Sequence, residues 1–354
     1  MNRIRFLHRI TLLAPVALFT SSCDTLQDSV APAASIMGAR ELTPGTHVVD
    51  LAAAGHDWKY TIHVPGHPRL DPAAPLVIVL HGSGEDGYTH LVLNGWIEES
   101  ESAGFAVAAP DGLALDPDQP ANLLTNPTFW NAEQPYLTDR RRAIDDLAFF
   151  DALLDDIAAR TTIDPKRIFV TGHSGGAGMA FRLAAQRSER FAGMAAVASP
   201  CWQNDPRPAK AVPSLFIVGT LDPIVPSGGG NQNILWLQRT TPPVSEILAK
   251  WGTALGCTGE TLETRANGLR TIEFRDCALG APFEAILVEG HGHRWPGGGT
   301  PMFPEFLIGP TTNHFDATAA IWQFFDRVSH RPPSVSLAKD GPRTGHRGSA
   351  LKIR

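Results

Sequence analysis

The sequence predicts an α/β fold with a mainly parallel, doubly wound sheet that carries helices on both faces. Two observations predict it: short, continuous apolar runs recur along the 354 residues, and helical patterns separate them. Strands that alternate with helices favour a parallel sheet covered on both sides. Residues 76–80 are apolar throughout, as expected of a strand buried on both faces. In such sheets the chemistry lies at the carboxyl ends of the strands.

The individual elements follow from the same patterns. We expect strands at residues 60–64, 76–80, 105–109, 168–170, 194–198, 215–218 and 285–288. We expect helices over residues 177–186 and 317–328. Another helix should run from about Ile144 to Ile157, where apolar residues recur at spacings of three and four.

The first 22 residues are typical of a signal peptide. Three Arg precede an apolar run at residues 10–20 that is too short to span a bilayer. Small residues then lead to Cys23, which leaves two alternatives: lipidation at Cys23, or ordinary cleavage nearby. We expect an exported protein whose only membrane association would be that lipid anchor. Residues 23–45 should be a linker, residues 46–330 the catalytic domain, and residues 331–354 a disordered basic tail.

The charge balance bears on the partners. The net charge is −6, and removal of three Arg with the first 22 residues would make it −9. Since phosphate binding needs basic patches, nucleic acid is not expected as a partner. The chain has no Cys/His spacing of the zinc-binding kind, so we expect neither metal nor cofactor. The sequence does not predict an oligomeric state.

The segment from Gly172 to Gly176 fits the pattern G-x-S-x-G with Ser174 at its centre. A predicted strand runs into it and a predicted helix runs out of it. A nucleophile elbow needs this arrangement, because the serine must sit on a tight, strained turn. The alternative is a glycine-rich turn that only joins strand to helix.

A serine nucleophile needs a base and an orienting carboxylate, and in α/β-hydrolases the chain order is Ser, Asp, His. Asp222 follows the strand at residues 215–218, and its alternative role is an Asp-Pro turn. His293 follows the strand at residues 285–288. His291 and, more distantly, His314 compete with it. We favour His293, because His291 lies between two glycines in what should be the most permissive part of the loop.

The oxyanion hole requires two backbone N–H groups. One should come from Gly175, the residue after the nucleophile. The other should come from the loop after residues 76–80, where we assign Ser83, with Gly84 as the alternative. The shape of the substrate cleft should depend on the loops at residues 112–143 and 223–245.

Cys257 and Cys277 are expected to form a disulfide, since they are close in sequence and export favours oxidation. Closing this loop would contribute about 3 kcal/mol in the chain-entropy model. The alternative is a pair of free thiols. Cys201 has no predicted partner.

These segments together resemble the polyhydroxybutyrate depolymerase and feruloyl esterase group of secreted α/β-hydrolases. The resemblance covers about residues 45–330. Its marks are the His81-Gly82 turn, Trp130-Asn131-Ala132, Asp145-Asp146, the elbow at residues 172–176, Gly219 to Pro223, Gly292 to Gly297, and the Asp316-Ala317-Thr318 end. The His-x-Trp-Pro-Gly stretch supports His293 as the base. The resemblance also implies that Trp295 lines the substrate cleft, although a core aromatic is the alternative. Relatives often carry Cys where this chain has Ser83.

The sequence therefore predicts a serine carboxylic-ester hydrolase that acts through an acyl-enzyme on soluble esters, such as feruloyl or acetyl esters or hydroxyalkanoate oligomers. One alternative is a serine peptidase of the prolyl-oligopeptidase type, which would normally carry a propeller domain. The other is a non-catalytic binding module on a hydrolase scaffold.

Overall fold

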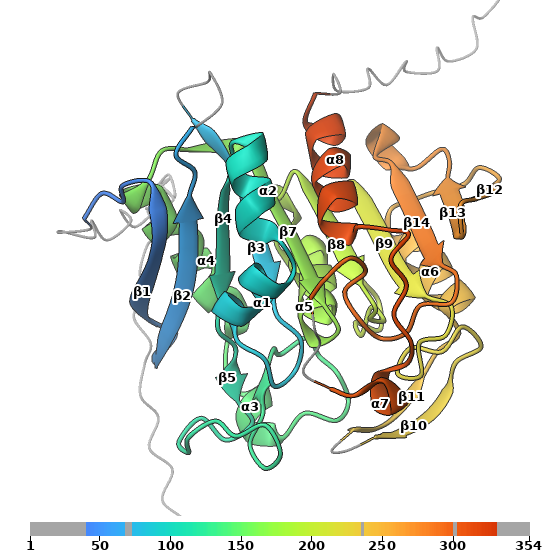
Figure 1. Cartoon of the computed structure of the whole chain (residues 1–354), viewed down its shortest axis with the longest axis horizontal. Coiled ribbons are helices and arrows are strands. Elements are labelled where there is room, and N and C mark those ends of the chain that lie inside the picture. The colour runs from blue at the N-terminus through green and yellow to red at the C-terminus, as the bar shows by residue number, and fades with distance from the viewer. Residues whose placement is uncertain (1–39, 68–72, 235–236, 300–302, 331–354) are drawn as a thin grey trace, which may run out of the picture. The chain divides into compact units, whose positions relative to one another are not determined.

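The computed structural model describes residues 40–67, 73–234, 237–299 and 303–330. Within these residues, ten strands form one sheet in the order β1-β2-β4-β3-β7-β8-β9-β14-β13-β12 (Figure 1). The strands from β4 to β14 pair in parallel. Antiparallel pairs extend the sheet at both edges. The mainly parallel sheet predicted from the sequence is therefore confirmed.

The strands of the main sheet are β1 (Gly45–Ala53), β2 (His56–Val64), β3 (Ala74–Leu80), β4 (Ala106–Pro110), β7 (Ile163–His173), β8 (Gly193–Val197), β9 (Ser214–Gly219), β12 (Leu262–Ala266), β13 (Leu269–Phe274) and β14 (Phe283–Val288). Two small hairpins lie apart from it. They are formed by β5 (Leu113–Ala114) with β6 (Thr128–Phe129), and by β10 (Gly230–Ile234) with β11 (Leu237–Thr241).

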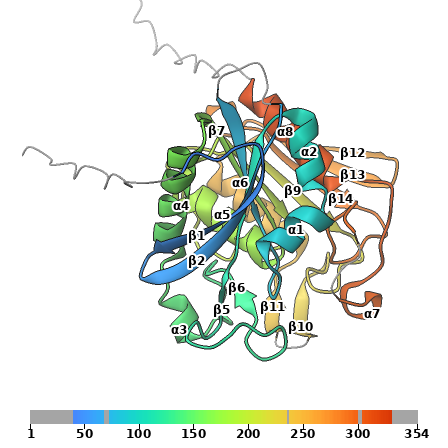
Figure 2. The ribbon, with the colours of Figure 1, turned by 60° about the vertical axis from the view of Figure 1, so that its left-hand side comes forward.

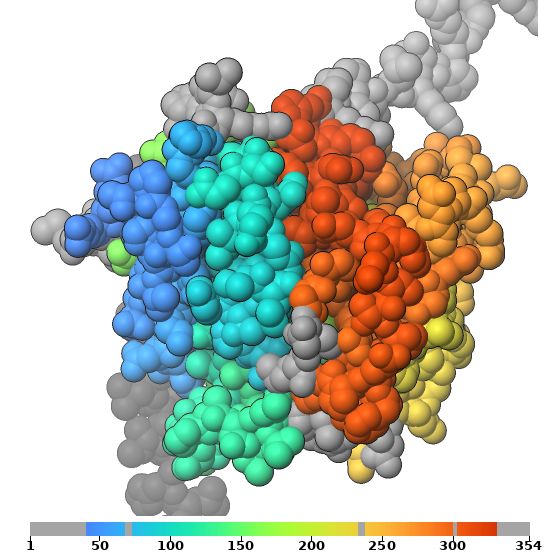
Figure 3. All heavy atoms as spheres, in the orientation of Figure 1, coloured from blue at the N-terminus to red at the C-terminus, as the bar shows by residue number. Residues whose placement is uncertain are grey.

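The helices cover both faces of the sheet, as Figures 1 and 2 show. One face carries α1 (Gly87–Leu93), α2 (Trp96–Ala103) and α8 (Ala317–Ser329). Figure 3 shows the surface of this face, where α1 and α2 lie beside the segment that ends in α8. The opposite face carries α4 (Asp146–Arg160), α5 (Gly175–Gln186) and α6 (Val244–Ala254), and two short helices, α3 (Asp139–Arg142) and α7 (Glu305–Ile308), lie among the loops.

Alternate residues of β3 serve two separate hydrophobic cores. Leu76, Ile78 and Leu80 pack in the core beneath α4, α5 and α6. Val77 and Val79 pack in the other, with residues of α2 and α8. All five side chains are fully buried. The continuous apolar run in the sequence is explained by this burial on both faces, because successive strand residues point to opposite sides.

The local sequence explains where α4 begins and how the chain turns between β12 and β13. The helix expected from about Ile144 is α4, which begins at Asp146. The Asp145 side chain accepts a hydrogen bond from the Ala148 N–H and so caps the first turn. Asn267 and Gly268, at φ of 52° and 74°, form the tight turn between β12 and β13. The sequence analysis did not predict β1, the β10–β11 hairpin or the β12–β13 hairpin.

Several predictions concern residues that the structure does not describe. The signal peptide at residues 1–22, lipidation at Cys23, most of the linker and the tail at residues 331–354 lie outside the described ranges. None of the described helices is long and apolar enough to cross a bilayer. The structure joins Cys257 to Cys277 in the expected disulfide, while Cys201 is a buried free thiol.

Candidate active site

The loops that follow the parallel strands gather at the lower edge of the sheet in Figure 1, with β5, α3, α7 and the β10–β11 hairpin around them. Ser174 lies there, on the single-residue turn between β7 and α5. Its backbone has φ of 50° and ψ of −115°, a conformation that non-glycine residues rarely adopt. Such strain costs on the order of 1–3 kcal/mol and is typical of functional sites.

The glycines of the elbow are required by backbone packing. A methyl group on Gly172 would lie 2.5 Å from the carbonyl carbon of Gly176. A methyl group on Gly176 would overlap the carbonyl oxygens of Leu80 and His81. Because both contacts are with main-chain atoms, neither can be relieved by a rotating side chain. The tight turn that exposes Ser174 therefore depends on glycine at both positions.

Ser174, His293 and Asp222 form a continuous chain of hydrogen bonds. His293 Nε2 lies 2.9 Å from Ser174 Oγ, and His293 Nδ1 lies 2.7 Å from Asp222 Oδ2. The other carboxylate oxygen of Asp222 accepts the N–H groups of Ile224 and Val225, each at 2.7 Å. Asp222 follows β9 and His293 follows β14, two neighbouring parallel strands. This arrangement lets His293 take a proton from Ser174 while Asp222 fixes the orientation of the ring.

The backbone around His293 is held by the end of α7 and the residues just after it. The His293 N–H donates to the Ile308 carbonyl at 2.5 Å, and the Gly292 N–H donates to Pro310 at 2.8 Å. A methyl group on Gly292 would lie 2.5 Å from the carbonyl carbon of Gly309. The imidazole is thus positioned by main-chain packing on both sides of the loop.

His291 is a buried structural residue. Its side chain is fully buried, and its Nδ1 accepts the Thr312 N–H at 3.1 Å. Its carbonyl accepts the Leu221 N–H at 2.9 Å, next to Asp222. The expectation that this is the most permissive part of the loop is therefore wrong, since tertiary contacts fix it. His314 lies elsewhere, with Nε2 3.2 Å from the Gly268 carbonyl.

Two backbone N–H groups lie beside Ser174 without a hydrogen-bond acceptor in the described part of the chain, those of Ser83 and Gly175. The two residues are neighbours, because a methyl group on Gly175 would lie 3.5 Å from Ser83 N. The Gly84 N–H instead donates to the Thr128 carbonyl at 2.9 Å. Of the two residues weighed for the second donor, only Ser83 therefore has its N–H available for an oxyanion.

Three side chains that the sequence analysis did not single out as functional hold this loop, those of His81, Glu85 and Trp130. His81 Nε2 accepts the Gly112 N–H at 2.8 Å, so its Nδ1 carries the proton and donates to the Gly82 carbonyl. Burial lowers the pKa of His81, which keeps the ring neutral. Glu85 accepts the Gly82 N–H at 2.9 Å, and the Trp130 indole N–H donates to the His81 carbonyl. The sequence offered one sign of this role, because His81 and Glu85 lie within the same glycine-rich turn.

Trp295 packs in the core instead of lining a cleft. Its side chain is 6% exposed, and its indole N–H donates to Thr318 Oγ1 at 2.9 Å. The ring packs edge-on against Trp96 at 6.0 Å and against His90 at 5.3 Å. Trp295 therefore fits the alternative role of a core aromatic residue. The contacts of its side chain do not support the cleft-lining role that the resemblance implied.

The His173 ring packs against the His293 imidazole. Its ring centroid is 5.0 Å from that of His293, and its side chain is almost fully buried. Burial, reinforced by the neighbouring His293, lowers the pKa of His173 to about 3. The His173 ring is therefore neutral near pH 7.

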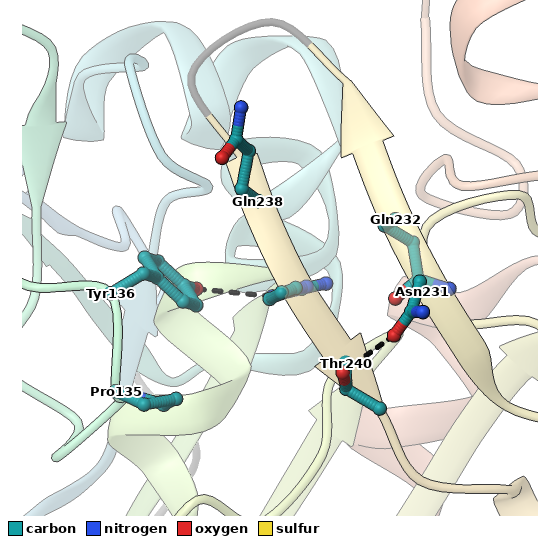
Figure 4. Close-up of a pocket in the computed structure, with 7 residues that line it drawn as sticks. Pro135, Tyr136, Asn231, Gln232, Gln238 and Thr240 are labelled. Carbon is teal, nitrogen blue, oxygen red and sulfur yellow. Dashed lines mark hydrogen bonds between the residues drawn. The ribbon is translucent and has the colours of Figure 1, made fainter.

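A cavity of about 610 Å³ lies between the two loops that were expected to shape the cleft. Figure 4 shows Pro135 and Tyr136 on one side and the β10–β11 hairpin, with Asn231, Gln232, Gln238 and Thr240, on the other. Arg239 completes the lining. The described residues contain no cluster of three His, Cys, Asp or Glu side chains arranged to hold a metal ion.

Residues 67–241 match the family model described as phospholipase/carboxylesterase. The chain is 31% identical over 295 residues to a putative esterase, NocK, of Nocardia uniformis subsp. tsuyamanensis, covering 74% of this chain and 77% of that protein. It is 28% identical over 282 residues to a probable feruloyl esterase C of Aspergillus niger, covering 75% and 83%. The solved acetyl xylan esterase of Aspergillus awamori shares the fold, with a TM-score of 0.50, 17% identity, and coverage of 70% and 94%. The chain is therefore a carboxylic-ester hydrolase that belongs to a feruloyl-esterase-like group of esterases, and about half of it matches the phospholipase/carboxylesterase family.

Proposed function

We propose that the protein hydrolyses soluble carboxylic esters through an acyl-enzyme on Ser174. The observation that carries the proposal is the hydrogen-bonded chain from Ser174 through His293 to Asp222, with the nucleophile on a strained turn. Ser174 Oγ attacks the ester carbonyl carbon as His293 Nε2 takes its proton. The N–H groups of Ser83 and Gly175 stabilise the tetrahedral oxyanion.

His293 then gives its proton to the leaving alcohol, and the C–O bond to that alcohol breaks. Water enters, loses a proton to His293 and attacks the acyl carbon. The bond from that carbon to Ser174 Oγ then breaks, His293 returns its proton to Oγ, and the acid is released. Feruloyl and acetyl esters are substrate classes to test, because relatives are named as feruloyl and acetylxylan esterases. Hydroxyalkanoate oligomers join them because the sequence motifs also resemble the polyhydroxybutyrate depolymerases.

The test compares aryl acyl esters, feruloyl esters and hydroxybutyrate oligomers with peptide anilides under the same conditions. We expect hydrolysis of esters, labelling of the wild-type protein by a fluorophosphonate, and loss of both in Ser174→Ala. A peptide anilide cleaved faster than every ester would favour the peptidase alternative. A folded protein that takes up no label would favour a binding module.

We further propose that the protein is exported, with lipidation at Cys23 or ordinary cleavage nearby as the two alternatives for its mature N-terminus. The support is the basic and apolar N-terminus and the Cys257–Cys277 disulfide, which is typical of oxidising compartments. Mass spectrometry of the mature N-terminus tests this. A chain that still begins at Met1 would contradict export, and an unmodified mature N-terminus would contradict lipidation.

A further inference from the structure

Arg239, on β11, is a cation with no counter-ion in the pocket beside the triad. Its guanidinium carbon lies 5.5 Å from the Tyr136 ring and 5.1 Å from the Trp202 ring. Within the described residues, its hydrogen bonds go to uncharged acceptors, and none of the seven residues that line the pocket is acidic. Aromatic faces attract the cation but leave the in-plane N–H groups free for an anion.

The N–H groups of Arg239 are only partly used. Nη1 donates to Tyr136 Oη at 3.0 Å and Nη2 donates to the Ile224 carbonyl at 3.2 Å. Nε is buried and has no hydrogen-bond partner among the described residues. A guanidinium presents five N–H donors in a planar fork that matches a carboxylate. Because a half-buried cation with an unmatched donor is costly, the site lacks one acceptor.

Tyr136 adds a second donor to the same place. Burial raises the pKa of Tyr136, although the charge of Arg239 acts in the opposite direction. The phenol is therefore neutral, and its oxygen accepts from Arg239 while its O–H proton stays available. The only hydrogen bond of this side chain within the described chain is the one from Arg239. Arg239 and Tyr136 thus face the pocket as donors.

The pocket is connected to the reacting centre on two sides. Arg239 holds the carbonyl of Ile224, whose N–H donates to Asp222. Trp202, beneath Arg239, lies so close to α5 that a methyl group on Gly178 would be 3.1 Å from its ring, and the Gly178 N–H donates to the Ser174 carbonyl. The residues of the pocket thus contact the two elements that carry Asp222 and Ser174.

We propose that Arg239 and Tyr136 bind a carboxylate carried by the substrate, so that the enzyme selects esters that have a free carboxylate in the acyl or the alcohol part. This inference rests on the proposed ester hydrolysis at Ser174. It adds a substrate class and two specificity-determining residues. A bound carboxylate would accept from the N–H groups of Nη1 and Nη2 that the Tyr136 hydroxyl and the Ile224 carbonyl leave unused.

The experiment uses rigid substrate pairs that differ in one charge. On the alcohol side these are 4-acetoxybenzoate and its methyl ester. On the acyl side they are the monophenyl ester of terephthalate and its methyl ester. In neither pair can the para carboxylate attack its own ester. We expect Arg239→Gln to lower the kcat/KM ratio of charged to neutral substrate about tenfold to a hundredfold in at least one pair, the loss typical of a charged hydrogen bond.

Arg327→Gln is the matched control. Arg327 also lies over an aromatic ring, at 5.4 Å from Phe324, but it belongs to α8 and pairs with Glu284. Its substitution should leave the charged-to-neutral ratio unchanged. An unchanged ratio in Arg239→Gln, or an equal fall for charged and neutral esters, would overturn the proposal. A wild-type protein that hydrolyses no ester would instead contradict the proposed function itself.

Discussion

The triad and the pocket beside it are built by different means. Around Ser174 the main chain packs against main chain, and glycine stands where any side-chain atom would overlap a carbonyl. The pocket is formed by side chains instead. Several of them, including Asn231, Gln238 and Thr240, are exposed on a two-stranded hairpin that stands apart from the main sheet.

We expect the elbow around Ser174 to govern reactivity and the pocket at the hairpin to govern substrate selectivity. A substitution near Ser174 has to move backbone, so it disturbs every reaction that uses the nucleophile. We expect a substitution on β10 or β11 to change the polar groups of the proposed carboxylate pocket and to leave the elbow where it is. The same fold can therefore keep its chemistry while the hairpin alters which esters are accepted.

The largest effect expected at the reacting centre separates two histidines. His293→Ala should lower kcat about 10⁴-fold to 10⁶-fold, because Ser174 would lose its base. His291→Ala should retain most of kcat and instead lower the free energy of unfolding by about 1–3 kcal/mol, since it removes a buried hydrogen-bonded ring. Steady-state kinetics and denaturant unfolding of both variants measure this. The reverse pattern would identify His291 as the base.

A smaller effect should separate two glycines. Gly176→Ala should push the elbow away from Leu80 and His81, misplace the oxyanion donors and lower kcat about 10²-fold or more. Overpacking should also lower the free energy of unfolding by about 1–3 kcal/mol. Gly228, near the hairpin, has open space around it, so Gly228→Ala should stay within about twofold of wild type. Equal activity in both variants would show that the elbow tolerates added bulk.

The smallest effect is a loss of stability in acid. The pKa of His173 is lowered to about 3, and those of His81 and His291 are also lowered, with burial as the main cause. Below about pH 6.5 the unfolded chain binds protons that the folded chain does not, so stability is full above this pH and falls as the pH drops. His173 alone should remove about 2 kcal/mol between pH 7.5 and pH 5.0.

Denaturant unfolding of His173→Asn at the two pH values tests this. In this variant the free energy of unfolding should differ less between pH 7.5 and pH 5.0 than in wild type, by the contribution of His173. In His67→Asn, which changes an exposed histidine, the difference should match wild type. A wild-type free energy of unfolding that is equal at both pH values would contradict the buried, neutral state of these rings.

The sequence predicted the central elements well because each carries a local signal. The buried strands are continuous apolar runs, α4 carries apolar residues at spacings of three and four, and the elbow lies between a strand and a helix. The edge strands were missed for the opposite reason. Residues of β12 are exposed throughout, so no apolar pattern marks them, and only their pairing with β13 makes them a strand.

Chain order and residue type by themselves determined the candidate triad, because the fold brings the ends of neighbouring parallel strands together at one edge. Only the tertiary structure decided which N–H groups are free. The Thr128 carbonyl accepts the Gly84 N–H, whereas the Ser83 N–H has no acceptor among the described residues. It also decided that Trp295 is a core residue and that Arg239 faces a pocket without an acid. Burial and hydrogen-bond satisfaction depend on residues distant in the chain, which no local pattern records.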